Sequence, residues 1–123
     1  NFFNKFTKER WSRRKFKNGF LPQRILIFEH EDMPIGFIHL NKKSEHDIYC
    51  GGFHLSKDYQ GKKFGEKIMQ HIIEKLSKQG FEVITGKVFK ENKNSLSFVK
   101  KMNFHIEGED KNENSYFVKR SLI

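Results

Sequence analysis

The segment from Asp58 to Gly65 reads Asp-Tyr-Gln-Gly-Lys-Lys-Phe-Gly and is predicted to be an anion-binding turn before a helix. The first N–H groups of a helix have no partner within the helix, and the helix dipole favours an anion beside them. Gly61 lets the backbone come close to a ligand, and Lys62 and Lys63 add positive charge. The expected chemistry is therefore the binding of a phosphate group.

The elements on both sides of this turn follow from hydrophobic periodicity. Gly80 ends the predicted helix after the turn, and residues 81–89 have the β-branched and aromatic content of a strand. A strand at 47–55, the turn, the helix and the second strand form a βαβ unit with its phosphate site at the end of the first strand. The apolar positions of the helix recur at helical spacing: Phe64, Ile68, Met69, Ile72, Ile73 and Leu76.

The rest of the chain is predicted to add one helix and further strands. Residues 2–17 are predicted to be helical, and Gly19 and Pro22 break that pattern. Three antiparallel strands at 24–29, 35–40 and 47–55 form a meander, in which the adjacent Gly51 and Gly52 favour a bulge. A helix near Asn92 precedes two short strands, at 104–106 and 116–118, which a polar loop joins.

Two motifs resemble the GNAT superfamily of acyl-CoA N-acyltransferases. The family signature at the turn is Arg/Gln-x-x-Gly-x-Gly/Ala; Gln60 and Gly65 match its outer positions, whereas Lys63 replaces the central glycine. The segment from Glu91 to Phe104 is similar to the family's later Asn-x-x-Ala/Ser helix, which normally closes in Tyr-x-x-x-Gly-Phe. The resemblance covers residues 24–120 and implies an α/β (α+β) fold with a mixed, mostly antiparallel central sheet. In this fold helices flank the sheet, and two strands splay apart at the cofactor cleft.

The resemblance also implies the reaction and its cofactor. The expected activity is transfer of an acetyl group from acetyl-CoA to a primary amine, which attacks directly in a ternary complex. The pantetheine arm would lie along the main chain before the turn, the pyrophosphate would lie in the turn with Gln60 orienting it, and the later helix would contact the cofactor. The implied cofactor-binding residues are Phe53, His54, Leu55, Gln60, Gly61, Lys62, Lys63, Phe64, Gly65, Asn92 and Ser95.

The catalytic groups are not fixed by the resemblance. The family often supplies an acid from a tyrosine, but Val99 occupies that position and has no proton to donate. Tyr49 and Ser95 are the weak candidates, and Tyr49 is more typical of a half-buried strand residue that packs against its neighbours. Val99 therefore leaves open an alternative, a catalytically silent CoA-binding or regulatory domain.

The acceptor amine is the least determined part of the prediction. The weak substrate-binding candidates are Glu29, at the end of a strand, and Trp11 and Arg14, in the predicted first helix. The formal net charge of +9 suits an acceptor that carries negative charge, such as an amino-sugar nucleotide. Other small amines, peptide amino groups, lysines, polyamines and aminoglycosides also remain open.

Composition sets independent limits on the protein. The 123 residues are expected to form one domain over residues 1–123, with 14 phenylalanines available for a core. No apolar run is long enough to cross a bilayer and the start has no signal-peptide pattern, so a soluble, cytoplasmic protein is expected. The first residue is Asn1 rather than Met, and no strand precedes the predicted first helix, so a fragment without the family's first strand is expected.

Charge and histidine spacing define the remaining alternatives. A basic cluster at residues 5–17 with interleaved aromatics leaves a nucleic-acid-binding module as a second alternative, although the two motifs disfavour it. The six histidines have no metal-ligand spacing, so no metal is expected. A small-molecule or peptide amine is the expected partner, a membrane partner is not expected, and a homodimer is left open.

Overall fold

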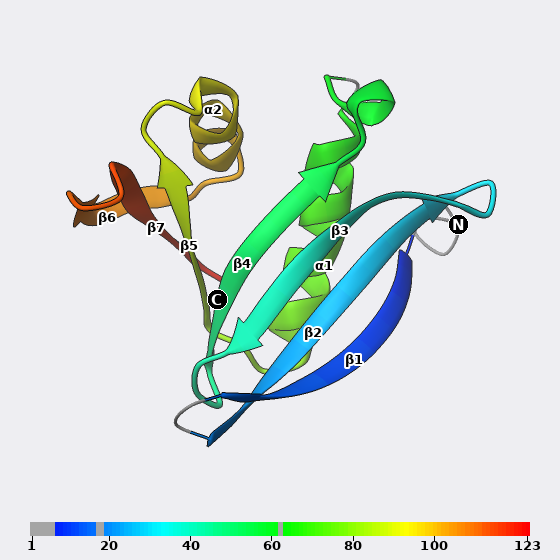
Figure 1. The fold of residues 1–123 in the computed structure, drawn as a ribbon, viewed down its shortest axis with the longest axis horizontal. Helices are drawn as coiled ribbons and strands as arrows, with labels where there is room; N and C mark the ends of the chain where they lie inside the picture. Colours follow the sequence, from blue (N-terminus) through cyan, green and yellow to red (C-terminus); the bar gives the residue numbers. More distant parts are fainter. Residues whose placement is uncertain (1–6, 17–18, 62) are drawn as a thin grey trace.

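A computed structural model describes the backbone of residues 7–16, 19–61 and 63–123, and side chains from residue 25 onward apart from residue 62 (Figure 1). The first four described elements are strands, and helices and strands follow them. In chain order they are β1 (Thr7–Phe16), β2 (Gly19–His30), β3 (Met33–Lys42), β4 (Asp47–Leu55), the 3-10 helix η2 (Lys57–Tyr59), α1 (Phe64–Lys78), β5 (Val83–Phe89), α2 (Lys93–Lys101), β6 (His105–Asp110) and β7 (Ser115–Ser121).

The seven strands form one sheet in the order β1-β2-β3-β4-β5-β7-β6. Every neighbouring pair is antiparallel except β4 and β5, which are parallel and are connected through α1. A parallel pair needs a crossover connection, and α1 supplies it. The predicted βαβ unit and the mixed, mostly antiparallel sheet flanked by helices are therefore confirmed.

One face of the sheet is buried beneath α1 and α2. The apolar stripe predicted for α1 is buried at Ile68, Met69, Ile72, Ile73 and Leu76. These side chains belong to one core cluster with apolar residues of β2 to β5 and with Met102 and Phe104 after α2. Removing each large apolar side chain from water contributes about 1.5–3 kcal/mol, so this face fixes the position of α1. Gly80, with φ of 95°, follows the end of α1 as predicted.

The helix predicted at residues 2–17 is wrong where the structure describes this segment. Residues 7–16 form β1, and each of them is paired with a residue of β2. Aromatic spacing favoured a helix, but the ladder to β2 satisfies the backbone groups of this segment instead. Residues 2–6 and 17 of the predicted helix lie outside the described residues. The meander therefore has four strands, and β1 covers the edge of β2.

Strand β2 begins at Gly19, before the predicted start at residue 24, and it includes Pro22. Proline has no N–H to donate and is disfavoured in the middle of a sheet. Pro22 pairs with Arg13 of β1, whereas the ladder to β3 begins only at Gln23. At Pro22 the strand therefore has a partner on one side only among the described strands, which is where proline can be accommodated.

Candidate functional site

Strands β4 and β5 separate part of the way along the sheet (Figure 1). Their parallel ladder runs from the pair Asp47–Val83 to the pair Cys50–Gly86. Beyond Cys50, β4 continues to Leu55 beside β3 alone, and β5 continues to Phe89 beside β7 alone. We call this divergence the fork. Because buried backbone groups need hydrogen-bond partners, the edge of β4 that faces the fork is suited to bind an extended ligand.

A β-bulge lies at the base of the fork. In the β3–β4 ladder Leu40 is opposite Cys50 and His39 is opposite Gly52, so Gly51 is an extra residue in β4. The bulge predicted from the adjacent glycines is therefore confirmed. An extra residue in one strand bends that strand and increases its twist. The bulge thus accounts for the departure of β4 from β5 immediately after Cys50.

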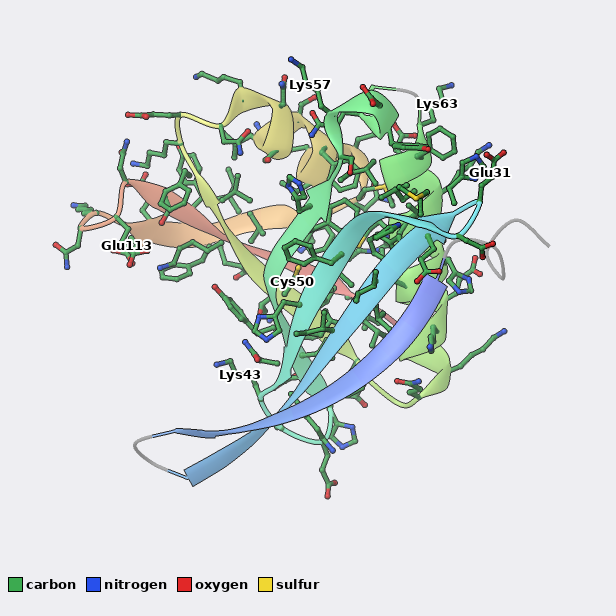
Figure 2. The ribbon with its side chains drawn as sticks, turned by 45° about the vertical axis from the view of Figure 1, so that its right-hand side comes forward. Glu31, Lys43, Cys50, Lys57, Lys63 and Glu113 are labelled. Atoms are coloured by element: carbon green, nitrogen blue, oxygen red, sulfur yellow. The ribbon has the colours of Figure 1, made fainter. Side chains whose placement is uncertain are left out.

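The turn between β4 and α1 has the backbone shape of an anion-binding turn. Gly61 has a φ of 73°, and Lys63, the N-cap of α1, has a φ of 65° and no side-chain capping bond. Lys63 thus adopts the left-handed conformation that glycine takes most easily, so the departure from the family motif leaves this backbone shape in place. The exposed Lys57 and Lys63 lie at the same end of the molecule (Figure 2). Lys62 lies outside the described residues.

Gln60 braces the turn against the end of β4. Its Nε2 donates a hydrogen bond of 2.7 Å to the carbonyl oxygen of Leu55. The sequence suggested that Gln60 orients a pyrophosphate and that the Leu55 main chain contacts pantetheine. In the structure the two residues contact each other, so the Gln60 amide nitrogen and the Leu55 carbonyl are already engaged.

Gly65 lies where β4, α1 and α2 meet. The rings of Phe53 in β4 and Phe98 in α2 are stacked, with centroids 5.6 Å apart and an interplanar angle of 17°. A Cβ atom on Gly65 would lie 3.4 Å from Phe98 Cε1 and 3.8 Å from Phe53 Cε1. A larger side chain at Gly65 would push against this stack. The ring of Phe64 instead faces Tyr59, with centroids 5.5 Å apart.

The later motif positions α2 beside the fork. Asn92 is the N-cap of α2, and its Oδ1 accepts a hydrogen bond of 3.1 Å from the Ser95 N–H. Asn103 follows the helix with a φ of 66°, at the position where the family pattern has glycine. Directly before Asn103, the carbonyl of Met102 accepts a hydrogen bond of 2.9 Å from Arg120 Nη1 of β7.

The catalytic candidates lie on different elements. Tyr49 is half-buried, one residue before the end of the β4–β5 ladder, and is paired with Thr85. The Nζ atom of Lys43 lies 5.2 Å from the centroid of the Tyr49 ring. Ser95 is half-buried at the start of α2. Val99 packs against the hydrophobic core, so the position of the family's tyrosine holds an apolar side chain.

Cys50 lies at the last pair of the ladder, beside the base of the fork. Burial raises the pKa of its thiol to about 11, and a hydrogen bond from the Gly52 backbone partly opposes this shift. The thiol is therefore protonated near neutral pH and is a poor nucleophile. Cys50 has the properties of a packing residue rather than of an acyl carrier.

The structure does not bring the predicted substrate residues to the fork. Glu29 pairs with Pro34 in the β2–β3 hairpin, two strands from β4. Trp11 and Arg14 are on the edge strand β1 rather than on a helix, three strands from β4. The predicted helical position of these two residues is therefore wrong, because β1 is paired along its whole length. The His54 side chain instead faces Phe37, with ring centroids 5.7 Å apart.

The sequence analysis missed two polar residues of β3 that adjoin the bulge, His39 and Asn41. A Cβ atom on Gly51 would lie 3.0 Å from His39 Nδ1 and 3.4 Å from Asn41 Nδ2. The alternation of buried Ile38 and Leu40 with polar neighbours was visible in the sequence. The position of the bulge opposite them depends on the register between β3 and β4, which the sequence pattern does not specify.

Two kinds of site are not found in the described part of the chain. No group of three or more histidine, cysteine, aspartate or glutamate side chains there could hold a metal ion. No described helix is long and apolar enough to cross a membrane.

Comparison with known proteins defines the class of this fold and site. The family model described as acetyltransferase (GNAT) family matches residues 1–104. The chain therefore belongs to the GNAT acetyltransferase family, whose members are acyl-CoA-dependent N-acyltransferases. The resemblance inferred from the two motifs is therefore confirmed. A search of curated proteins gives no match.

Solved structures share the fold of this chain. PaiA N-acetyltransferase from Thermoplasma acidophilum, in complex with coenzyme A, has a TM-score of 0.73 and 22% identity, over 79% of this chain and 59% of that one. Ard1 from Thermoplasma volcanium has a TM-score of 0.73 and 18% identity, over 80% of this chain and 70% of that one. Naa50 from Arabidopsis thaliana, in complex with the bisubstrate analogue CoA-Ac-MVNAL, has a TM-score of 0.67 and 22% identity, over 79% and 72%. This chain thus spans 59% of the length of the first of these structures.

Proposed function

We propose that this chain is an N-acetyltransferase that transfers an acetyl group from acetyl-CoA to a primary amine by direct attack in a ternary complex. The observation that carries the proposal is the fork, where β4 leaves β5 after Cys50 and leads into a turn with left-handed backbone at Gly61 and Lys63. Acetyl-CoA has an extended thioester arm and an anionic end. The fork and the turn follow one another in the order that these two parts of the cofactor need. The fork supplies backbone groups for the arm, and the turn supplies the start of a helix for the phosphates.

The cofactor residues have distinct proposed roles. The β4 main chain of Phe53 and His54 would bind the pantetheine arm, and the Leu55 N–H would extend that contact. The turn from Gly61 to Gly65 would hold the pyrophosphate, with Gln60 maintaining its shape through the hydrogen bond to Leu55. At the start of α2, Asn92 maintains the helix terminus beside which Ser95 would contact the cofactor.

Proton transfer does not require an acid at Val99. When a neutral amine attacks the thioester carbonyl, its nitrogen becomes acidic as the new bond forms. A proton from this nitrogen can then pass to the departing sulfur, directly or through water. The apolar Val99 is therefore compatible with turnover, although a silent CoA-binding domain remains the alternative to be tested.

The acceptor is proposed to be a small primary amine or a peptide amino group. The bisubstrate complex of Naa50 joins CoA to a peptide, which makes a peptide acceptor worth testing first. The net charge of +9 favours acceptors that carry negative charge, such as an amino-sugar nucleotide, over polyamines. A nucleic-acid-binding module is the other alternative, and it predicts binding that weakens steeply with salt.

Calorimetric titration with acetyl-CoA and with CoA tests the cofactor assignment. Gly65→Val should weaken CoA binding at least about tenfold, because its side chain would push against Phe98 and obstruct close approach to the turn. Gly108→Ala is the matched control, since a Cβ there would come no closer than 4.0 Å to Phe117, in a different part of the sheet. Unchanged CoA affinity in a folded Gly65→Val protein would contradict the assigned phosphate site.

An assay for thiol release then separates an enzyme from a silent domain. The protein is incubated with acetyl-CoA and a panel of peptide amines, amino sugars and amino-sugar nucleotides, and free CoA thiol is measured. Turnover with any amine supports the proposed activity. Binding of CoA without turnover across the panel would favour the silent CoA-binding domain.

A further inference from the structure

His39 and Asn41 lie on the face of the sheet opposite α1. In β3 the side chains of Ile38 and Leu40 are fully buried in the helix-covered core. Successive side chains of a strand point to opposite faces, so His39 and Asn41 point to the other face. There they adjoin the bulge, since a Cβ atom on Gly51 would lie 3.0 Å from His39 Nδ1 and 3.4 Å from Asn41 Nδ2. Both residues are therefore next to the base of the fork.

Open space lies above Gly52, next to His39. Gly52 is paired with His39, and a Cβ atom on Gly52 would have no described atom within 4 Å. On the other side, Tyr49 is paired with Asn41 in the β3–β4 ladder. A ligand group bound over Gly52 would thus be in contact with polar side chains and with the bulged backbone at the same time.

Asn41 has an unsatisfied hydrogen-bond acceptor. Its Oδ1 atom is buried and has no hydrogen-bond partner among the described residues. Buried polar atoms of native proteins are nearly always paired, so an unpaired buried acceptor on a residue that adjoins the bulge indicates a missing donor. A primary amine supplies N–H donors in both its neutral and its protonated forms.

We propose that His39 and Asn41 form the acceptor site, with Asn41 Oδ1 accepting an N–H of the amine and the His39 imidazole acting as general base. This inference rests on the proposed acetyl transfer and names the residues that would bind and deprotonate the acceptor. It places the amine on the face of β3 and β4 opposite α1, at the base of the fork. The thioester carbonyl would reach the same point along β4, so nucleophile and electrophile would meet beside the bulge.

The proposed step moves two protons and one acetyl group. An ammonium acceptor gives one proton to the imidazole nitrogen of His39, which leaves a neutral amine with a free electron pair. The amine nitrogen forms a bond to the carbonyl carbon of acetyl-CoA, and the carbon–sulfur bond breaks with its electron pair left on sulfur. A second proton from the amine nitrogen passes to that sulfur, giving an amide and free CoA thiol. The imidazolium then releases its proton to water.

The surroundings of His39 leave few other groups for this role. On the same face, β2 presents the apolar Ile25 beside His39 and Ile27 beside Phe37. From β4 the titratable side chains on this face are Asp47, Tyr49 and His54, of which Tyr49 and His54 pair with Asn41 and Phe37. The Lys43 Nζ atom lies 5.2 Å from the centroid of the Tyr49 ring. Imidazole is the side chain used most often as a general base. His39 is preferred to His54 because it adjoins Gly51, whereas the His54 ring faces Phe37.

A binding experiment tests Asn41 without a known acceptor. The probe is CoA whose sulfur is joined through an acetyl group to methylamine, so that an amide nitrogen takes the place of the acceptor nitrogen. Asn41→Leu should lose at least about tenfold in affinity for this conjugate while binding CoA within about twofold of the wild type. Asn112→Leu, in the β6–β7 turn, is the matched control and should change neither affinity. Equal loss for conjugate and CoA, or no loss for either, would overturn the role of Asn41.

A pH profile tests His39 once an accepted amine is found. His39→Asn should lower kcat/KM near neutral pH about 100-fold or more, and the loss should shrink as pH rises, because more of the amine is then neutral without a base. Hydroxylamine, which is neutral at the assay pH, should react equally well with both proteins. CoA affinity and the unfolding temperature should stay unchanged. A variant with a wild-type pH profile would overturn the role of His39, whereas wild-type protein that fails to bind CoA would overturn the proposed function itself.

Discussion

At the scale of single residues, three positions at the base of the fork have different roles. Gly51 provides the bulge, His39 adjoins it on one face of the sheet, and Cys50 marks the last β4–β5 pair. The sequence identified Gly51 through its neighbour Gly52, because adjacent glycines in a strand have few other structural explanations. It gave no reason to single out His39, because a histidine in a strand is commonplace until the register places it beside the bulge.

Cys50 is expected to make stability depend on pH above neutrality. Burial raises the pKa of its thiol from 9.0 to about 11. Between these values the unfolded thiol loses its proton first, so deprotonation favours the unfolded state and stability falls as pH rises. From about pH 8 to about pH 10 the loss due to this thiol should be about 1.4 kcal/mol. Urea unfolding of the wild type and of Cys50→Ala at both pH values measures this difference.

Other groups also titrate in this range, so the comparison between the two proteins is decisive. The wild type should lose more stability than Cys50→Ala over the same pH interval. Cys50→Ala also removes packing, but that cost is the same at both pH values and cancels in the comparison. Parallel pH dependence of the two proteins would contradict a protected thiol.

At the scale of elements, local patterns predicted α1 and failed for β1. The apolar residues of α1 recur at helical spacing and one glycine follows the helix. All of these apolar side chains except the half-buried Phe64 are buried in the structure. In residues 7–16 the aromatic spacing favoured a helix, but pairing with β2 decided the conformation. Such pairing depends on contacts with a separate segment, so local periodicity cannot predict it. The motif at 91–104 succeeded because Asn92 caps a helix within its own sequence.

The pairing of β3 with β4 requires glycine at position 36. A Cβ atom on Gly36 would overlap the carbonyl oxygen of His54. This oxygen belongs to the backbone and cannot move aside as the end of a flexible side chain could. Gly36→Ala should therefore destabilise the protein by about 1–3 kcal/mol through overpacking. Gly52→Ala is the matched control in the partner strand, since its Cβ would meet no atom within 4 Å, and its effect should stay within about 0.5 kcal/mol. Chemical denaturation of both variants checks the prediction, and equal stabilities would contradict it.

At the scale of the whole molecule, one continuous sheet becomes two arms. At the level of Asp47 to Cys50 the ladder between β4 and β5 joins the two halves of the sheet. Above it, β4 leads into the turn and α1, whereas β5 leads into α2, as Figure 1 shows. The sequence predicted this order of elements, but the point of separation comes from the register and the bulge. A ligand in the fork would replace the missing strand partner of β4 and join the two arms.

Hydrogen exchange should detect this replacement. In the free protein, fork-facing amides of residues 51–55 should exchange faster than those of residues 47–50, which have strand partners on both sides. Acetyl-CoA at about 100 times its Kd stabilises the bound state by about 2.7 kcal/mol and should slow exchange of these amides up to about 100-fold. Amides in the β1–β2 ladder, away from the fork, are the internal control and should slow less. A single-stranded oligonucleotide should give no such protection at 51–55. Uniform slowing across the sheet with acetyl-CoA would mean that the ligand stabilises the fold without occupying the fork. Slowing of exchange by the oligonucleotide alone would favour a nucleic-acid-binding surface instead.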